Sequence, residues 1–225
     1  MSASIVSRPS PNFDARPKDI PVDMLVLHYT GMECADAALD KMCDPEFGVS
    51  AHYMIGEDGA VSALVAEDQR AWHAGVSFWR GETDINGRSV GIELVNPGHQ
   101  FGYRAFLGPQ MAALESLAKE ILARHPIEAR NIVGHSDVAP GRKTDPGELF
   151  DWAGLAAAGI GLWPDGEGEG DPGTVAEMLA AFGYDTRDPD AAVAAFQSHF
   201  HPQSLGGTAD GALAGRLRVL LDLCA

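Results

Sequence analysis

Short apolar runs punctuate the first part of the chain and are typical of buried strands. Such runs predict strands over residues 23–29, 89–95 and 131–134. Two further runs, at 52–56 and 61–65, flank a turn with the letters EDGA, and this pairing is a hairpin signal. The strand pattern therefore predicts one sheet of mixed strand directions.

Apolar positions at helical spacing predict helices between and after these strands. Residues 35–42 have helical character, and a helix near 149–158 follows the last strand. A longer helix begins at Pro109, a residue type favoured in the first turn of a helix. Its apolar stripe consists of Met111, Leu114, Leu117, Ala118, Ile121 and Leu122.

The composition changes around Trp163, where the acidic, glycine-rich run PDGEGEGDPG predicts a linker. Three helical stretches follow it, at residues 172–182, 189–200 and 210–223. At the other end of the chain, repeated prolines break any helix within residues 1–21, and we expect an extended arm there.

The expected fold is α/β, with a mixed central sheet flanked by helices and a small all-α three-helix domain attached. We place the α/β domain, including its extended arm, at residues 1–165. The three-helix domain is placed at residues 166–225.

The chain is acidic, because 32 Asp and Glu residues outnumber 16 Lys and Arg residues and give a formal net charge of −16. Such a charge repels nucleic acid and anionic membranes, so nucleic acid is not an expected partner. No apolar run approaches the roughly 20 residues that a membrane helix needs, and we expect no membrane insertion. Oligomeric state cannot be inferred from these features.

The cysteines indicate a reducing environment. Cys34, Cys43 and Cys224 are odd in number and lack the spacing of metal ligands. If Cys34 and Cys43 share a helix, a rise of about 1.5 Å per residue holds them too far apart for a disulfide. The N-terminus has no apolar core of a secretory signal. We therefore expect a cytoplasmic protein, with the periplasm as the alternative if a leader has been removed.

The run GHSDVAPGRKTDPG carries the most informative chemistry. It sets His135, Lys143 and Asp145 in one short Pro/Gly-rich loop. Zinc binds imidazole nitrogen and carboxylate oxygen together, and a catalytic zinc site leaves its fourth position to water. His28, at the end of the apolar run MLVLHY, is the candidate for the remaining ligand. The sequence therefore predicts a zinc hydrolase.

Two alternatives to this metal site stay open. The letters GHSD could form a capping or turn motif, with Lys143 and Asp145 as a solvated surface pair. Asp137 is a rival to Asp145 as the carboxylate ligand, although it lies only two residues beyond His135, where coordination by both would strain the chain.

Glu93 is the candidate catalytic base. It stands in the apolar run SVGIELVN, where strand alternation points its side chain away from those of Ile92 and Leu94. A carboxylate beside a metal-bound water can take a proton and pass it to a leaving amine. The alternative is a carboxylate on a solvated face of the sheet.

Five ordered motifs, LVLHYTG, SAHYMIGEDG, AWHAG, VGIELVN and GHSDVAPGRKTDPG, resemble the zinc-dependent N-acetylmuramoyl-L-alanine amidases. This fold family includes the AmpD-type amidases and the peptidoglycan recognition proteins. The resemblance covers about residues 8–160. The tail, with AAFGYD, AVAAFQSHFHP and GTADGALAGRL, resembles the three-helix peptidoglycan-binding domain that often follows this amidase.

The resemblance implies that His28, His135 and Asp145 bind Zn²⁺ and that Glu93 and Lys143 form the catalytic pair. The reaction it implies is hydrolysis of the amide between the lactyl group of muramic acid and the L-alanine of the stem peptide. Muropeptides or peptidoglycan are then the partners. A non-catalytic protein that recognises muropeptides is the alternative, and the presence of Asp145 disfavours it.

Other polar and aromatic residues are assigned more loosely. Trp72 and His73 are expected to line the substrate cleft, although core packing serves equally well for Trp72. Asn96 could hydrogen-bond the stem peptide or cap the end of a strand. For His52 we favour a supporting role over that of a fourth ligand. His125 is expected at the end of a helix, and solvated surface positions are expected for His99, His199 and His201.

The substrate is the least determined part of this hypothesis. The cytoplasmic expectation favours 1,6-anhydro-muropeptides released during cell-wall recycling. The tail that resembles a wall-binding domain favours intact murein instead, although its helices could also pack on the amidase and shape its cleft. A third hypothesis, a phosphate- or nucleotide-binding protein, is disfavoured because the chain has neither a P-loop nor a GxGxxG run.

Overall fold

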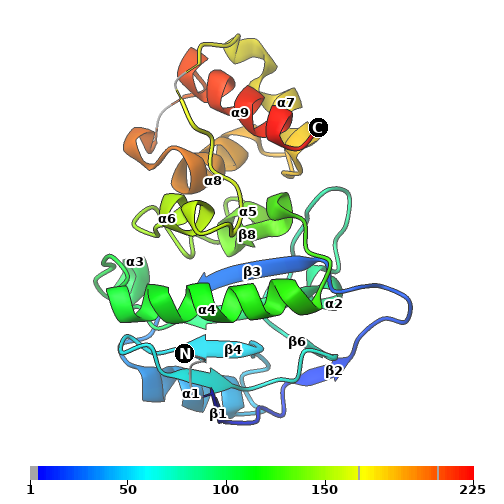
Figure 1. Ribbon diagram of the computed structural model, residues 1–225, viewed down its shortest axis with the longest axis vertical. Coiled ribbons are helices and arrows are strands. Elements are labelled where there is room, and N and C mark those ends of the chain that lie inside the picture. The colour runs from blue at the N-terminus through cyan, green and yellow to red at the C-terminus, as the bar shows by residue number, and fades with distance from the viewer. Residues whose placement is uncertain (1–4, 167, 207) are drawn as a thin grey trace.

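The computed structural model describes residues 5–166, 168–206 and 208–225 (Figure 1). A six-stranded sheet forms its centre, in the order β1-β5-β4-β7-β3-β8, and only the pairing of β4 with β5 is antiparallel. A two-stranded antiparallel sheet joins β2 and β6. The mixed sheet is therefore confirmed. The strands are β1 (Ile5–Ser7), β2 (Phe13–Ala15), β3 (Met24–Tyr29), β4 (Tyr53–Ile55), β5 (Val61–Ala63), β6 (Gln69–Ala71), β7 (Ser89–Leu94) and β8 (Ile132–Gly134).

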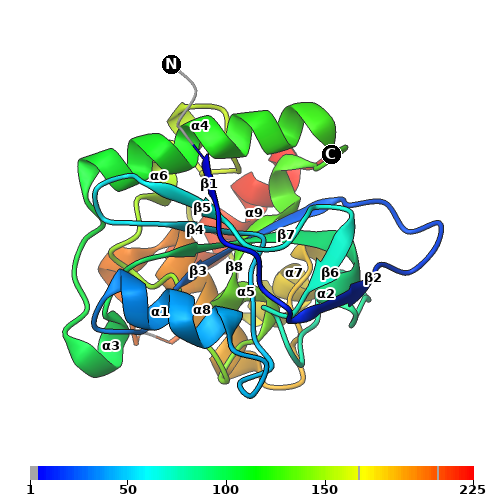
Figure 2. The ribbon, with the colours of Figure 1, turned by 90° about the horizontal axis from the view of Figure 1, so that it is seen from below.

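Helices cover both faces of the central sheet. Figure 2 shows α4 on one side of the sheet and α1 on the other. Helices α7, α8 and α9, called the C-terminal helices below, lie together at one end of the molecule, beyond α5 and β8 (Figure 1). The α-helices are α1 (Ala35–Cys43), α2 (Ile85–Arg88), α3 (Gly98–Phe101), α4 (Gly108–Arg124), α5 (His135–Val138), α6 (Trp152–Ala157), α7 (Val175–Phe182), α8 (Pro189–Phe200) and α9 (Gly211–Leu223).

Strand β3 shows why a continuous apolar run is needed at the centre of the sheet. Its side chains alternate between the two faces, and both faces are covered. Leu25 and Leu27 pack in the core beneath α4. Met24 and Val26 pack on the opposite face with residues of the C-terminal helices. His28 continues this second set, so the alternation brings an imidazole to the end of a buried row.

The predicted helices form close to their expected bounds. Helix α4 buries Leu114, Leu117 and Ile121 of its predicted stripe, because these residues recur on one helical face. Helices α8 and α9 begin where aspartates cap them. Asp188 accepts a hydrogen bond from the N–H of Ala191, and Asp210 accepts one from the N–H of Leu213.

Three local features differ from the predicted pattern. The extended arm forms β1 and β2, each of which pairs with a strand from residues 61–71, whereas residues 1–4 lie outside the described part. Strand β6 and the short helix α2 were not expected. The run after β8 is not wholly a loop, because His135 begins the single-turn helix α5.

A shared core joins the C-terminal helices to the sheet. One cluster of buried side chains contains Val26 and Val133 from the sheet, Trp79 from a loop, and Phe182 and Phe196 from the C-terminal helices. The predicted domain boundary between residues 165 and 166 stays a prediction, and Glu167 of the predicted linker lies outside the described residues. Whatever the boundary, the sheet and the C-terminal helices exclude water together.

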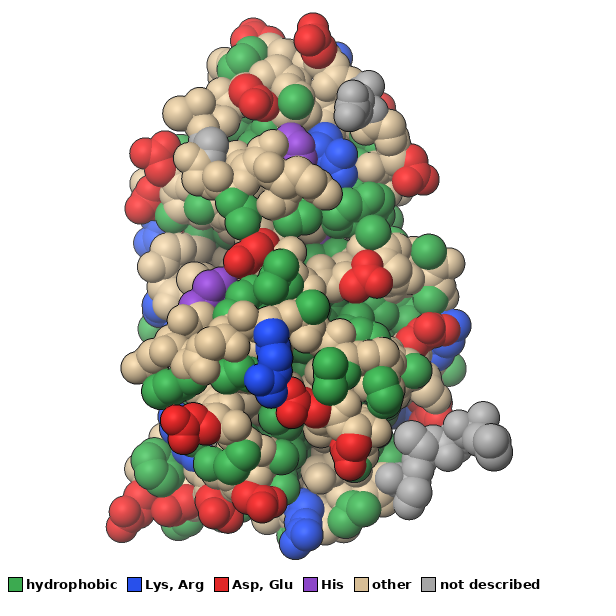
Figure 3. Space-filling model, turned by 90° about the vertical axis from the view of Figure 1, so that its left-hand side faces the viewer, with side chains coloured by type: hydrophobic (Ala, Val, Ile, Leu, Met, Phe, Trp, Pro, Cys, Tyr) green, Lys and Arg blue, Asp and Glu red, His purple; other side chains and the backbone are tan. Residues whose placement is uncertain are grey.

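The surface agrees with the acidic composition. On the face shown in Figure 3, acidic side chains are spread over the whole height of the molecule. Within the described residues, every helix is too short or too polar to cross a lipid bilayer.

The shared core predicts how unfolding proceeds. Trp79 is 1% exposed and contacts Phe182 and Tyr184. We expect Trp79→Ala to lower the free energy of unfolding by about 3–5 kcal/mol. The sheet and the C-terminal helices should still melt in one calorimetric transition, with a midpoint temperature lowered by roughly 10 °C. The exposed Leu223→Ala is the control and should leave the transition in place. Two separate transitions, with only one of them shifted, would contradict the shared core.

Candidate active site

Three parallel strands end side by side and carry the candidate residues to one place. His28 in β3 pairs in register with Glu93 in β7, so their side chains leave the same face of the sheet. Gly134 ends β8 beside Leu27, which places His135 next to His28. The carboxyl ends of parallel strands are the usual place for a ligand in an open α/β sheet.

The loop after α5 returns Asp145 to the two imidazoles. The N–H of Ser136 donates to the carbonyl oxygen of Asp145 at 2.9 Å and fixes this return. His28 Nδ1 lies 3.0 Å from His135 Nδ1 and 3.0 Å from Asp145 Oδ2. His135 Nδ1 lies 3.1 Å from the same Oδ2. The structure therefore brings together the three side chains predicted to bind a metal, and all three are buried.

Hydrogen bonds on the far side of the ring fix the tautomer of His135. Its Nε2 lies 3.0 Å from the carbonyl oxygen of Ala74, which can only accept, so Nε2 carries the proton. Arg142 Nη2 also lies 3.3 Å from Nε2. Arg142 Nη2 donates its two hydrogens to the carbonyl oxygens of Ala74 and Val76, at 2.7 and 2.6 Å, so neither is left for His135. In the neutral ring, Nδ1 is then an unprotonated lone pair that faces Asp145.

A longer relay fixes His28 in the same way. The hydroxyl of Ser89 donates to the carbonyl oxygen of Ile85 at 2.7 Å, so its oxygen is left to accept from His73 Nε2 at 3.1 Å. His73 Nδ1 is therefore unprotonated and accepts from His28 Nε2 at 3.0 Å. Burial, and secondarily the neighbouring His135, lower the pKa of His28 to about 4, which keeps its ring neutral at pH 7. His28 Nδ1 is thus also a free lone pair.

When both rings are neutral, three lone pairs therefore meet with no proton between them. Acceptor atoms about 3 Å apart repel unless a proton or a cation lies among them. Tetrahedral ligands at about 2.1 Å from zinc stand about 3.4 Å apart, a few tenths of an ångström more than the distances here. The donor set and its spacing fit one small divalent cation.

The relay also explains a glycine in a central strand. A Cβ atom at Gly91 would lie 2.5 Å from Cγ of His73. Only glycine lets the imidazole lie directly on β7, where it can reach both His28 and Ser89.

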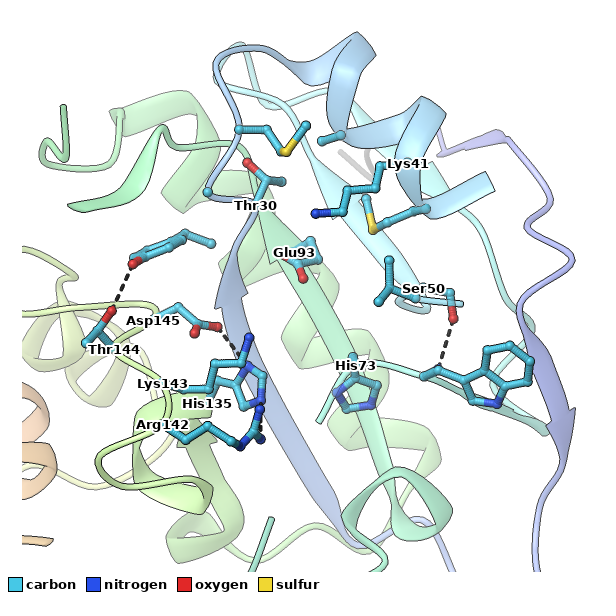
Figure 4. Close-up of a pocket in the computed structure, with 17 residues that line it drawn as sticks. Thr30, Lys41, Ser50, His73, Glu93, His135, Arg142, Lys143, Thr144 and Asp145 are labelled. Carbon is cyan, nitrogen blue, oxygen red and sulfur yellow. Dashed lines mark hydrogen bonds and ion pairs between the residues drawn. The ribbon is translucent and has the colours of Figure 1, made fainter. Parts of the chain in front are cut away.

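A cavity of about 350 Å³ opens over this group, a size that suits a small-molecule ligand (Figure 4). His73, Glu93, His135, Lys143 and Asp145 line it, and Figure 4 shows that they come from different strands and loops.

Glu93 lies in this cavity with an unusual carboxyl group. Its Oε2 is buried and receives no hydrogen bond from the described part of the chain. Burial, and secondarily the charge of Asp145, raise its pKa well above the ordinary range, whereas Lys143 acts in the opposite direction. An unpaired buried carboxyl with a raised pKa, beside a predicted metal site, is typical of a catalytic acid or base.

The predicted site lies within a segment of the chain that matches a known protein family. The model of the family described as N-acetylmuramoyl-L-alanine amidase matches residues 18–148. The chain belongs to this amidase family. All five predicted metal-binding and catalytic residues fall within the matched range.

Similarity to an individual relative extends over almost the whole chain. AmiD, an N-acetylmuramoyl-L-alanine amidase of Escherichia coli (strain K12), is 37% identical over 231 residues, 89% of this chain and 83% of AmiD. The solved complex of E. coli AmiD with anhydro-N-acetylmuramic acid-L-Ala-D-gamma-Glu-L-Lys has a TM-score of 0.82 at 36% identity, and covers 93% of this chain and 91% of that one. The alignment covers so much of this chain that it includes the C-terminal helices.

A second solved structure gives the same picture. AmpDh3 from Pseudomonas aeruginosa, in complex with anhydromuramic pentapeptide, has a TM-score of 0.75 at 31% identity and covers 92% of this chain and 95% of that one. The 1,6-anhydro-N-acetylmuramyl-L-alanine amidase AmpD of Citrobacter freundii is 36% identical over 162 residues, which are 64% of this chain and 84% of AmpD. The predicted resemblance to the amidases is confirmed.

The three residues predicted to contact the substrate differ in their positions relative to the cavity. Trp72 and His73 both line the cavity, but each ring nitrogen of His73 is already used by a neighbour. Asn96 does not line it. The side chain of Asn96 accepts from the N–H of Gly98 at 3.1 Å and donates to the carbonyl oxygen of Arg104 at 2.7 Å. The alternative role for Asn96, a cap at the end of a strand, is the one this geometry supports.

The remaining histidines include one wrong prediction. His199 is 2% exposed, not solvated, because it stacks between Trp152 and Phe200 in the core. His99 is exposed, as predicted, and His201 is partly buried. His125 follows the last turn of α4, as expected.

Two residues considered as alternative ligands have other partners. His52 receives the N–H of Gly91 on Nδ1 at 2.9 Å and lies 2.9 Å from Arg16 through Nε2, outside the metal group. The supporting role favoured for His52 agrees with these contacts. Asp137 is held by Tyr184 and His199 and lies outside the metal group.

Sequence reasoning missed Ser89, Arg142 and Ala74. Arg142 stands beside Lys143 in the loop, but a charge next to a lysine predicted to be catalytic gives no sign that it binds a distant backbone carbonyl. Ala74 acts through its backbone carbonyl oxygen, which every residue has, and Ser89 acts through a hydroxyl that nothing in the local sequence connects to His73. The hydrophobic pattern carries no signal for such contacts.

The relay from Ser89 to His28 can be tested by metal binding. We expect Ser89→Ala to weaken zinc binding by about 10- to 100-fold, because His73 loses the acceptor that orients it and so loses its hold on His28. Competition with a chromophoric chelator measures this affinity. Ser77→Ala, which removes a hydroxyl that donates to the carbonyl oxygen of Gly75, is the matched control and should bind zinc normally. Equal zinc affinity for both variants would exclude the relay.

The raised pKa of Glu93 predicts a pH-dependent cost in stability. The unfolded carboxyl ionises near pH 4.5, whereas the folded one keeps its proton to higher pH, so the metal-free fold loses stability as the pH rises between these values. We therefore expect metal-free Glu93→Gln to melt above the wild type at pH 7 and level with it below about pH 4. Thermal unfolding in EDTA measures this, with the exposed Glu46→Gln as control. A lower melting temperature for Glu93→Gln at pH 7 would contradict the assignment.

Proposed function

We propose that this chain is a zinc hydrolase that cleaves the amide between N-acetylmuramic acid, or its 1,6-anhydro form, and the L-alanine of the peptidoglycan stem peptide. It would act in cell-wall recycling or turnover. One observation carries the proposal: the lone pairs of His28, His135 and Asp145 meet in the cavity that Glu93 and Lys143 also line. A cation and a carboxylate base in one open cavity can perform metal-assisted amide hydrolysis.

Zinc is the cation that the donor set supports best. Two neutral imidazoles with one carboxylate form a typical catalytic zinc site, whereas magnesium and calcium prefer oxygen ligands throughout. When bound, zinc would polarise the carbonyl of the substrate and lower the pKa of a water molecule towards about 7.

Glu93 is proposed to move the proton. It would take a proton from the attacking water as this adds to the lactyl carbonyl, and then deliver it to the amine of the departing L-alanine. A group that must both accept and release a proton works best with a pKa near the working pH. Burial already raises the pKa of Glu93 in that direction.

Lys143 is proposed to stabilise the oxygen that becomes negative when water adds. It lies three residues after Pro140 in the loop that carries Asp145 and lines the cavity with Glu93. Lys41 and Arg142 line the same cavity, so cations gather there in a chain whose net charge is −16. Such a lining suits the carboxylates of a stem peptide.

The ligands seen with relatives support the choice of substrate. AmiD and AmpDh3 were solved with anhydromuramoyl peptides, and we propose the same class for this chain. Trp72 offers an aromatic surface on the cavity wall for the sugar or the peptide. Wall binding by the C-terminal helices and a cytoplasmic location stay predictions.

The test compares the full-length wild type with Lys143→Ala on an anhydromuropeptide. The wild type should release a free L-alanine amine, lose this activity in EDTA and regain it with zinc. Lys143→Ala should lower kcat by about 10²- to 10³-fold, because one donor to the oxyanion is lost, while zinc stays bound. Product formation by mass spectrometry and zinc by elemental analysis give the two readouts.

The surface variant Lys119→Ala is the matched control and should keep the wild-type kcat. Near-normal turnover by Lys143→Ala would defeat the role of Lys143 alone. A zinc-loaded wild type that binds the muropeptide without releasing the amine would defeat the proposed activity and indicate a recognition protein. Repeating the assay with reduced muropeptides compares the anhydro form with the form found in murein.

A further inference from the structure

A buried carboxylate joins the metal-binding turn to the C-terminal helices. Asp137 lies in α5, two residues after His135, and is 0% exposed. The N–H of Gly134 donates to its Oδ2 at 2.7 Å, and the hydroxyl of Tyr184 donates to its Oδ1 at 2.6 Å. Nδ1 of His199 donates to Oδ2, also at 2.6 Å. Three donors therefore hold one carboxylate.

Two of these donors come from a distant part of the chain. Tyr184 lies two residues after the end of α7, and His199 lies in α8. Both lie beyond residue 148, where the match to the amidase family model ends. Both donors therefore lie outside the segment that the family model matches, whereas Asp137 lies within it.

Packing holds both donors in place. The ring of His199 stacks on Trp152 at 3.6 Å and on Phe200 at 3.7 Å. Tyr184 packs edge-on against Trp79 at 5.1 Å. Neither ring can turn away from Asp137 without opening the shared core, so the hydrogen bonds have a fixed direction.

The hydrogen bonds to Asp137 constrain the backbone next to two predicted metal ligands, His135 and Asp145. Through the N–H of Gly134 it fixes the residue before His135. The next residue, Ser136, is tied to the backbone of Asp145. The turn is tightly packed, because a Cβ atom at Gly134 would lie 2.7 Å from Cδ of Pro146.

Simple docking of the helices does not account for this arrangement. Burying a carboxylate costs free energy that apolar side chains of similar volume would not cost. Apolar contacts between the same elements already exist, since Val138 of α5 shares a core with Phe196 of α8. The polar contacts add a fixed orientation of the backbone, which a turn that carries metal ligands requires.

We propose that Tyr184 and His199 are positioning residues, through which the C-terminal helices hold the turn that carries His135 and Asp145 in its metal-binding geometry. The C-terminal helices then complete the catalytic centre in addition to any contact with the cell wall. This inference rests on the proposed function, because it concerns the same metal.

His199 allows the two roles of one side chain to be separated. His199→Phe keeps an aromatic ring for the stack but removes the donor. His199→Asn keeps a donor near the position of Nδ1 but removes the ring. Tyr184→Phe removes one hydroxyl and leaves the packing. Val193→Ala, in the same helix, trims the core without touching Asp137 and is the control for stability.

The full-length variants are compared by zinc affinity, measured with a competing chelator well below the lowest melting temperature, and by the melting temperature of the metal-free protein. Tyr184→Phe and His199→Phe should each raise the Kd for zinc by about 10-fold. His199→Asn should bind zinc within about 3-fold of the wild type although it melts earlier. Val193→Ala should melt earlier with an unchanged Kd.

Two results overturn the inference alone. One is a wild-type Kd in both Tyr184→Phe and His199→Phe. The other is a Kd that follows the melting temperature across all variants, Val193→Ala included, because a purely structural contact would behave in that way. A wild-type protein that binds no zinc would instead overturn the proposed function, and this inference with it.

Discussion

The structure depends on one electrostatic constraint: lone pairs of two imidazoles and one carboxylate point at a single spot. Hydrogen bonds on the outer side of each ring enforce this, through Ala74 for His135 and through His73 and Ser89 for His28. Such a cluster is unfavourable until a cation enters it. With both rings neutral the site therefore holds repulsion that the proposed cation would relieve, and folding must supply the stability that keeps these acceptors together.

The sheet supplies that stability by its register. Parallel pairing of β3 with β7 and β8 sets His28, Glu93 and His135 at neighbouring strand ends, so that no flexible loop has to find them. Apolar rows on both faces fix the register, because a slip by one residue would turn each row to the wrong face. The buried, unpaired carboxyl of Glu93 is a local weakness that this framework tolerates, as is usual where stability is exchanged for chemistry.

The C-terminal helices also contribute to the framework that holds the site. They share a core with the sheet, and their polar residues Tyr184 and His199 meet Asp137 beside the metal-binding turn. The linker and the approximate bounds of these helices were predicted from local sequence, because a glycine-rich acidic run and apolar positions at helical spacing are patterns among near neighbours. Their contact with the turn was not, since it joins residues that local sequence cannot relate.

The sequence alone determined strands β3, β4, β5, β7 and β8, the long helices and the candidate ligands, because alternation, helical spacing and the motif GHSDVAPGRKTDPG are local patterns. The expected solvated position of His199 was wrong for the complementary reason: a histidine at the end of an amphipathic helix looks exposed until a stacking partner such as Trp152 arrives from elsewhere. Only the tertiary structure decided which nitrogen of each imidazole faces the predicted metal position and what holds Asp137. Those outcomes depend on hydrogen-bond partners far away along the chain, which come within reach only when the sheet and the C-terminal helices exclude water together.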